Sequence, residues 1–294
     1  MLRRVTHVLL IVIGFSVFAV AQCASDNRSE KHGGVVVTDF TITGTTTLSS
    51  TDLTRLSGDF VGSCYNDDSD EMGERLRAAF QDRGYFTAEV KHLTFKPADP
   101  LGTPKPVTVE ADVAEGPKYR VGEIMFLNNH AFSSERLRDE FSLKRGDVFN
   151  RDKIASGLVS LMKLYGSSGF LDYSSIPETE PGSNGIITLT LTVDEGPQYH
   201  MGKLEILAGK ETAARLRAEW KMAEGAAYDS TYIRKFIEAN GSMLPEGFTA
   251  GDARQVMSCP ESVVDVSLAL DPREGKSELP VKSIPCESHN DKSK

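Results

Sequence analysis

Val113-Ala-Glu-Gly-Pro-Lys-Tyr-Arg-Val-Gly122 is a stretch that returns 80 residues later, as Val193-Asp-Glu-Gly-Pro-Gln-Tyr-His-Met-Gly202. A sequence that resembles itself at a fixed offset indicates that one supersecondary unit is repeated along the chain. Each occurrence ends one run of alternating apolar and polar residues and begins another, with a Gly-Pro pair between them. The stretch is therefore predicted to be a junction, where the last strand of one unit passes into the first strand of the next.

The residues around these junctions predict the same order of elements in each unit. In the second unit, Ile124 and Phe126 indicate a first strand, and Ser133 or Ser134 caps a short helix. A longer helix follows with apolar residues at spacings of three and four, then a hairpin whose last strand alternates strictly over residues 187–193. We therefore expect an α+β fold of three tandem βααββ units, each a three-stranded mixed sheet covered by two helices.

The first unit begins its helices with a recognisable signal, and the third departs from the pattern. Ser49 to Asp52 resemble a capping box, in which side chains satisfy the first backbone N–H groups of a helix. In the third unit the long helix is cut short by Asn240-Gly241 and Pro245, as is common for a terminal repeat.

The chain is thus expected to divide into six segments. The N-terminus has two arginines, a short apolar run and Ala19-Val20-Ala21, the pattern of a cleaved signal peptide. An uncleaved anchor is the alternative, but the apolar run is shorter than the roughly 20 residues that a spanning helix needs. The expected segments are a signal peptide at 1–21, a disordered lead-in at 22–34, the first unit at 35–117, the second at 118–197, a degenerate third at 198–274 and a polar tail at 275–294.

The charge argues against nucleic acid as a partner. The formal net charge is −9, and removal of the signal with its two arginines makes it about −11, whereas nucleic-acid binding needs a basic surface. Metalloprotease, nucleophile-elbow and phosphate-loop motifs are absent from the sequence, and its histidines are isolated from one another. We therefore predict no enzymatic activity, no metal site and no cofactor.

Four cysteines in an exported chain can form disulfides. They allow three pairings, between which sequence cannot choose. We expect Cys259 to pair with Cys286, because both bound the last strand region.

The βααββ order, the Gly-(Tyr/Phe) pair at Gly84 and Gly169 before each hairpin, and the Glu-Gly-Pro-x-Tyr junction resemble the polypeptide-transport-associated (POTRA) domain. The resemblance covers about residues 35–274. It implies a periplasmic, outer-membrane-associated module that handles unfolded β-rich polypeptides, usually as the arm of an outer-membrane barrel. The sequence ends where such a barrel would begin, so we expect a free-standing scaffold whose partners are an outer-membrane barrel or its assembly factors.

The resemblance also implies a binding surface. The second strand of a POTRA sheet lies at an edge, where unpaired backbone groups can receive another strand, a mode called β-augmentation. Mapped onto this sequence, the edges are residues 86–95, 170–176 and 248–256. The candidate partner contacts are Phe86, Ala88, Val90, Phe170, Tyr173, Ile176 and Phe248.

The junctions carry a second set of candidate residues: Glu115, Gly116, Pro117, Tyr119, Glu195, Gly196, Pro197 and Tyr199. The glutamates either contact partners or cap the backbone beside Gly-Pro, and we favour capping. The tyrosines are expected to anchor one unit on the next. Gly84, Gly169 and Gly247 are expected to end helices in the left-handed conformation.

These observations favour a non-enzymatic periplasmic scaffold that binds polypeptides by β-augmentation during outer-membrane protein assembly or secretion. Two alternatives remain. The chain is the detached or truncated arm of an outer-membrane barrel, or it is an inner-membrane-anchored structural protein of an envelope complex.

Overall fold

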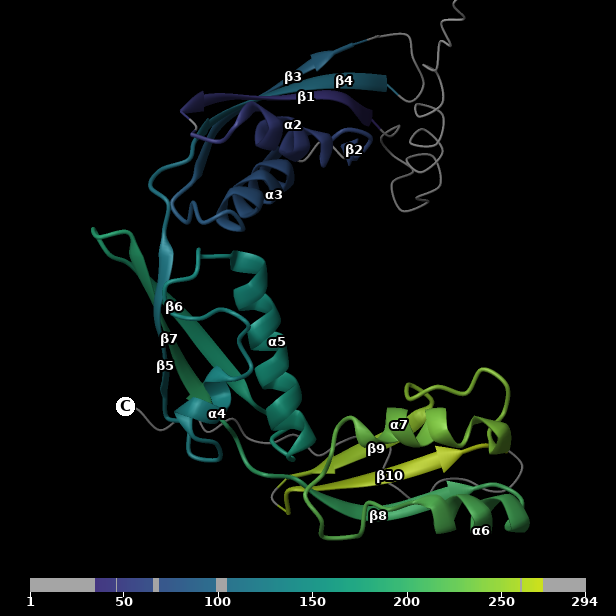
Figure 1. Ribbon diagram of the computed structural model, residues 1–294. Coiled ribbons are helices and arrows are strands. Elements are labelled where there is room, and N and C mark those ends of the chain that lie inside the picture. The colour runs from purple at the N-terminus through teal and green to yellow at the C-terminus, as the bar shows by residue number, and fades with distance from the viewer. Residues whose placement is uncertain (1–34, 46, 66–68, 99–104, 260, 272–294) are drawn as a thin grey trace, which may run out of the picture. The chain divides into compact units, whose positions relative to one another are not determined.

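The computed structural model describes residues 35–45, 47–65, 69–98, 105–259 and 261–271 (Figure 1). These residues belong to two compact parts. The first comprises the described residues up to Arg120 together with Gly146–Arg151 and Pro181–Ile186, and the second comprises Val121–Arg145, Asp152–Glu180 and the residues from Ile187 onward. The predicted signal peptide, lead-in and polar tail fall outside the described ranges.

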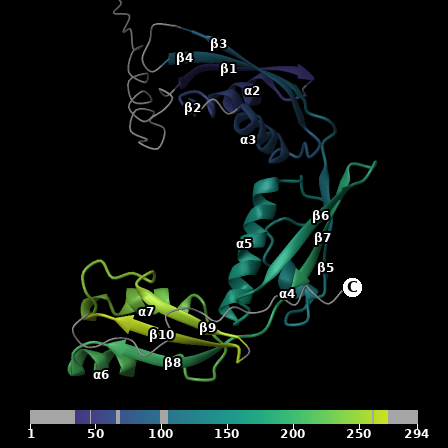
Figure 2. The same cartoon turned by 180° about the vertical axis from the view of Figure 1, so that it is seen from behind.

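The first repeat has the predicted order of elements plus one short strand. Its elements are β1 (Val35–Thr45), α2 (Ser50–Gly58), β2 (Cys64–Tyr65), α3 (Ser69–Gln81), β3 (Glu89–Pro97) and β4 (Lys105–Ala114). The sheet order is β2-β1-β4-β3, with β1 parallel and β3 antiparallel to β4. Both views show α2 and α3 on the same face of this sheet (Figures 1 and 2). The two-residue β2 was not predicted.

The core of the first repeat lies between that sheet face and the helices. The strict alternation of β4 buries Val107, Val109, Ala111 and Val113, and the helices contribute Leu56, Met72, Leu76 and Phe80. The capping prediction for α2 is confirmed, because the Asp52 backbone N–H donates to Ser49 Oγ at 3.1 Å.

The second repeat is β5 (Arg120–Leu127), α4 (Ser134–Arg138), α5 (Arg151–Ser167), β6 (Ser174–Pro181) and β7 (Ile186–Asp194). Its sheet order is β5-β7-β6. Of the two serines considered for the cap of α4, Ser133 is the N-cap, since its Oγ accepts the Arg136 N–H at 3.2 Å. On β7, Ile187, Leu189, Leu191 and Val193 are buried, as the alternation predicts.

The third repeat keeps the order with shorter helices. Its elements are β8 (His200–Leu207), α6 (Lys210–Glu219), α7 (Tyr232–Ala239), a 3-10 helix η1 (Gly241–Met243), β9 (Ala253–Ser258) and β10 (Val263–Ala269), with sheet order β8-β10-β9. The α7 helix has eight residues where α5 has 17, and it ends where Asn240 Nδ2 donates back to the Phe236 carbonyl. The expected α+β class and its three βααββ units are thus confirmed.

The structure tests the predicted disulfide only in part, and it bears on membrane-spanning helices only within the described residues. Cys259 is disulfide-bonded, but Cys286 lies beyond the described residues, so the Cys259–Cys286 pairing stays a prediction. In the part of the chain that the structure describes, no helix is both long enough and apolar enough to cross a membrane.

Candidate functional site

The second strand of each hairpin lies at a sheet edge. β3, β6 and β9 each stand last in the strand order of their sheets. These strands begin later than the predicted edges: at Glu89 instead of Phe86, at Ser174 instead of Phe170, and at Ala253 instead of Phe248. The apolar residues before each strand are therefore placed by packing in the turn that follows the helix, and not by strand pairing.

In the first repeat, only Val90 of the three candidate contacts belongs to the edge strand. It is half-buried in β3, opposite Val113. Ala88 is buried just before the strand, and the Phe86 ring packs edge-on against Phe149 at 5.3 Å. Phe86 thus contributes to the junction that follows its repeat.

The second and third repeats show the same division. Ile176 lies in β6 and is 65% exposed, whereas Tyr173 precedes β6 and stacks on Tyr165 with 4.1 Å between ring centroids. Burial raises the pKa of the Tyr173 phenol. Phe170 meets the same Tyr165 ring edge-on at 5.8 Å, and Phe248 packs against the core of the third repeat.

The backbone direction of β3 follows from one hydrogen bond at its end. The Ala98 N–H donates to the Pro106 carbonyl at 2.9 Å, so the backbone N–H of Ala98 points towards β4. Successive residues of a strand face opposite sides, and β3 is paired in regular register from Pro97 to His92. Leu93 and Pro97 therefore direct their backbone groups away from β4, towards the open side of the edge.

The same reasoning applies to β6. The Gly182 N–H donates to the Ile186 carbonyl at 2.8 Å across the hairpin, so the backbone N–H of Gly182 points towards β7. The backbone of its neighbour Pro181 therefore faces away from β7. Pro177 lies four residues earlier in the same strand, and we infer the same outward direction for it. Proline in a sheet is confined to such outward positions because it has no N–H for the ladder. Both prolines stand in the sequence Ser-Ser-Ile-Pro-Glu-Thr-Glu-Pro, where they are a sequence signal for a protected edge strand.

The junction glutamates bind backbone N–H groups within their own repeat. Glu195 Oε1 accepts the N–H groups of His130 and Ala131, each at 2.9 Å, and the Tyr165 hydroxyl at 3.0 Å. Glu115 is 2% exposed, and its Oε1 accepts the Thr47 N–H at 2.5 Å. Each carboxylate therefore closes the loop that follows the first strand of its repeat. This arrangement is a capping role, although the capped backbone is not the one beside Gly-Pro.

The junction tyrosines make the same backbone contacts in both copies. The Tyr119 N–H donates to the Gly84 carbonyl at 2.8 Å, and the Tyr199 N–H donates to the Gly169 carbonyl at 2.7 Å. Gly84 and Gly169 have φ of +99° and +92°, as expected for glycines that end helices. A Cβ at Gly169 would lie 2.5 Å from the Tyr199 carbonyl oxygen, so this glycine also permits close approach of the next strand.

The Tyr199 side chain is fully buried and hydrogen-bonded. Its hydroxyl donates to Asp172 Oδ2 at 2.8 Å and lies 3.0 Å from Cys259 Sγ. Burial, and then the bond to Asp172, raise the pKa of Tyr199 to about 12. The disulfide-bonded Cys259 is thus in contact with Tyr199 of the second junction.

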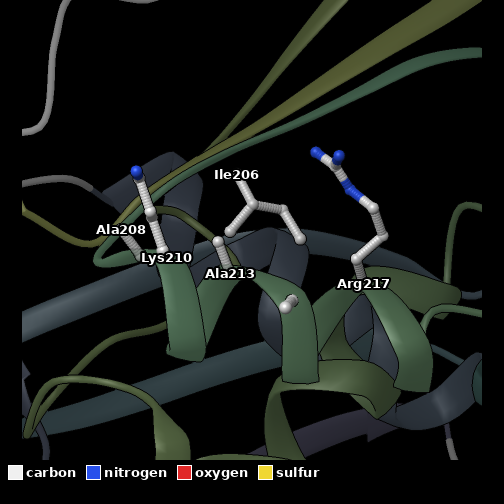
Figure 3. A pocket seen from close by; sticks show the side chains of 6 residues that line it. Ile206, Ala208, Lys210, Ala213 and Arg217 are labelled. Carbon is white, nitrogen blue, oxygen red and sulfur yellow. The ribbon is translucent and has the colours of Figure 1, made fainter.

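Figure 3 shows a pocket beside α6, where Ile206 lies between Lys210 and Arg217. Ala208, Ala213 and Ala214 complete its lining. Two cationic side chains and an apolar surface line this pocket. Over the described ranges, no group of three or more His, Cys, Asp or Glu side chains is arranged to hold a metal ion.

Comparison with known proteins matches two stretches of the chain to one family. The family described as "POTRA: Surface antigen variable number repeat" matches residues 35–116 and 119–196, which is more than half of the chain. Among curated relatives, the outer membrane protein assembly factor BamA of Neorickettsia risticii (strain Illinois) is 22% identical over 187 residues, which cover 63% of this chain and 24% of that protein.

Two further comparisons agree with that match. The outer membrane protein assembly factor BamA of Neisseria meningitidis serogroup B is 26% identical over 112 residues, which cover 34% of this chain and 14% of that protein. The crystal structure of Haemophilus influenzae BamA POTRA3-5 has a TM-score of 0.54 at 19% identity, covering 81% of this chain and 96% of that one. The chain thus spans less than a quarter of the length of the two BamA relatives.

Proposed function

The chain belongs to the POTRA family, and from that premise we propose that it is a scaffold for outer-membrane protein assembly or secretion that binds extended polypeptide segments at its sheet edges. The family is non-enzymatic. The observation that carries the proposal is the position of β3, β6 and β9, each at the end of its sheet. Such strands present backbone N–H and C=O groups to which another strand can pair.

The partners follow from the same premise. The BamA relatives are named outer membrane protein assembly factors, so the proposed partners are an outer-membrane barrel, its assembly factors, and unfolded β-rich client polypeptides. The proposed compartment is the periplasm, at the outer membrane. The proposed binding elements are the edge strands, with Val90 of β3 as a contact. The proposed repeat boundaries are 35–117, 118–197 and 198–274.

The test is photo-cross-linking in intact cell envelopes. A photoreactive residue replaces His92, an exposed residue of β3, and a matched control replaces Arg215 on the exposed side of α6. We expect capture of an outer-membrane barrel or its assembly factors from position 92 only. Capture restricted to inner-membrane proteins, or no capture by a folded protein, contradicts the proposal. The first of those results favours the anchored structural protein.

A further inference from the structure

The three edge strands differ in ways that bear directly on strand addition. Resting on the proposed function, we infer that the three edges are not equivalent: β3 is the edge that receives an incoming strand, and β6 is closed to one. The inference combines the backbone donors of each edge, the room beside it on the helix face, and its charge.

The β6 edge lacks donors where an incoming strand needs them. Pro177 and Pro181 both face outward, and neither has an N–H. Alternate residues supply the outward N–H groups, so two of the four outward positions of β6 cannot donate. Each lost hydrogen bond lowers affinity by a factor of about 2 to 10. Proline on an edge is a recognised protection against unwanted strand pairing.

The β3 edge loses only one of its outward donors. Its nine residues have one proline, Pro97, at the very end. Leu93 faces outward in the middle of the strand, next to a register shift between Val90 and His92. The side chains of Val90 and Leu93 are only partly buried against the core of the first repeat. An added strand would cover them.

The helix beside each edge gives the same contrast. Counting back 11 residues from the glycine that follows each helix gives Gly73 before Gly84 and Leu158 before Gly169. The same alignment of the two helices pairs Phe80 with Tyr165, and both of these side chains are buried. The alignment therefore matches the buried faces of α3 and α5. A Cβ at Gly73 would have only Leu93 Cδ1 within 4 Å, at 3.7 Å, so α3 leaves room beside the edge strand for a further side chain. In α5, the half-buried Leu158 takes that place.

Charge separates the same two edges. β3 carries exposed Lys91 and His92, whereas β6 carries exposed Glu178 and Glu180. The segment that fits β3 is therefore an extended stretch of an unfolded β-rich polypeptide. It has apolar residues at alternate positions, an acidic residue near Lys91, and no proline.

β9 has no proline but is a poorer acceptor than β3. It is six residues long, and Cys259 directly after it is disulfide-bonded. The chain directly after β9 is therefore constrained by a disulfide. We place β9 between β3 and β6 in its capacity to receive a strand.

The experiment uses the full chain and a synthetic peptide that copies Ile186–Asp194, which alternates apolar residues with threonine and ends in an aspartate. Photoreactive residues are placed singly at His92 in β3, Glu178 in β6 and Gln255 in β9. We expect the cross-linking yield at position 92 to exceed that at position 178 by at least about tenfold, with an intermediate yield at position 255. Equal yields at 92 and 178 would overturn the inference and leave the proposed function standing. No cross-link at any edge would count against the proposed function itself.

A pair of leucine substitutions tests the room beside β3 without touching its backbone. Gly73→Leu introduces the residue found at the matching place of α5, and we expect it to lower peptide binding at β3 about tenfold while the circular dichroism spectrum is unchanged. Gly58→Leu is the control, because a Cβ at this last residue of α2 meets nothing within 4 Å. Equal loss in both variants, or no loss in Gly73→Leu, contradicts the inference.

The reverse change tests β6. Pro177→Thr and Pro181→Thr restore two N–H donors, and Leu158→Ala opens room beside them. We expect this triple variant to raise cross-linking at position 178 at least fivefold. A folded triple variant that still fails to cross-link at β6 shows that proline and Leu158 are not what closes this edge.

Discussion

Glu195 shows how a residue of a repeated motif obtains its role from a distant part of the chain. Its carboxylate lies in the junction sequence but binds the loop at His130 and Ala131, some 65 residues earlier, together with the Tyr165 hydroxyl. Glu115 does the same for Thr47. The glutamate recurs because in each repeat its carboxylate binds the loop that follows the first strand.

Replacing Glu195 measures how much these hydrogen bonds contribute to the free energy of unfolding. We expect Glu195→Ala to lower the free energy of unfolding by about 2 kcal/mol, because two backbone donors and a buried hydroxyl lose a charged acceptor. Urea denaturation gives the value. Glu178→Ala on exposed β6 is the control and should change stability by less than about 0.5 kcal/mol. Similar losses in the two variants would argue against a capping role.

Gly169 and Gly225 allow two roles of glycine to be separated: adopting a positive φ and permitting the close approach of another strand. Both have positive φ, +92° and +82°, but a Cβ at Gly169 would lie 2.5 Å from the Tyr199 oxygen, while a Cβ at Gly225 meets nothing within 4 Å. Gly225→Ala should therefore lower stability by about 1 kcal/mol, the ordinary cost of a left-handed residue. Gly169→Ala should lower it by about 3 kcal/mol or more in the same urea titration. Equal effects would mean that the second junction adjusts freely.

Tyr199 predicts a loss of stability at alkaline pH. Its folded pKa is raised to about 12, chiefly by burial, while an unfolded tyrosine titrates near pH 10. Between these values the unfolded state has released a proton that the folded state keeps, so stability falls as the pH rises from about 10 to 12. We expect Tyr199→Phe to lose less stability over this window than the wild type does. Parallel pH profiles of the two proteins would contradict the assignment.

At the scale of elements, the helices α3 and α5 occupy matching places but bury different residues. α3 has Gly73 beside β3, whereas α5 has the buried Gly157 against Phe141. The two glycines look alike in sequence, since each lies inside a helix with an apolar face. Their surroundings predict opposite effects of the same substitution.

We expect Gly73→Ala to raise the free energy of unfolding by about 0.5–1 kcal/mol, because alanine favours a helix over glycine and meets only Leu93 at ordinary contact distance. Gly157→Ala should instead lower it by about 1–3 kcal/mol, since its Cβ would lie 2.2 Å from Phe141 Cδ1 in the core. Thermal and urea unfolding of both variants provide the comparison. A stabilised Gly157→Ala would show that Phe141 moves aside without loss.

At the scale of the whole molecule, the proposed function requires that the chain reach the periplasm. Arg3-Arg4, the apolar run and Ala19-Val20-Ala21 predict export with cleavage after Ala21. We expect mass spectrometry of the protein from a periplasmic fraction to give Gln22, or its cyclised form, as the first residue. Met1 in a membrane fraction would instead support the inner-membrane-anchored alternative.

The repeat, the βααββ order and most of the core could be predicted from the amino-acid sequence alone. These features depend on residues close together in the chain: the alternation on β7, the serine caps at Ser49 and Ser133, and the glycines that end α3 and α5. The short α7 helix of the third repeat was also predictable, because Asn240-Gly241 and Pro245 interrupt its helical pattern locally. The position of the edges was expected only through resemblance to POTRA domains.

Packing in three dimensions sets where each edge strand begins, which of its residues face outward and what lies beside it. Phe86 and Tyr173 are aromatic residues of the kind that is common in strands. Contacts of Phe86 with Phe149, and of Tyr173 with Tyr165, nevertheless hold them outside the strands. The target of the Glu195 carboxylate and the room at Gly73 were equally hidden in the sequence. These features depend on contacts between residues some 8 to 65 positions apart, which no local pattern of hydrophobicity or capping encodes.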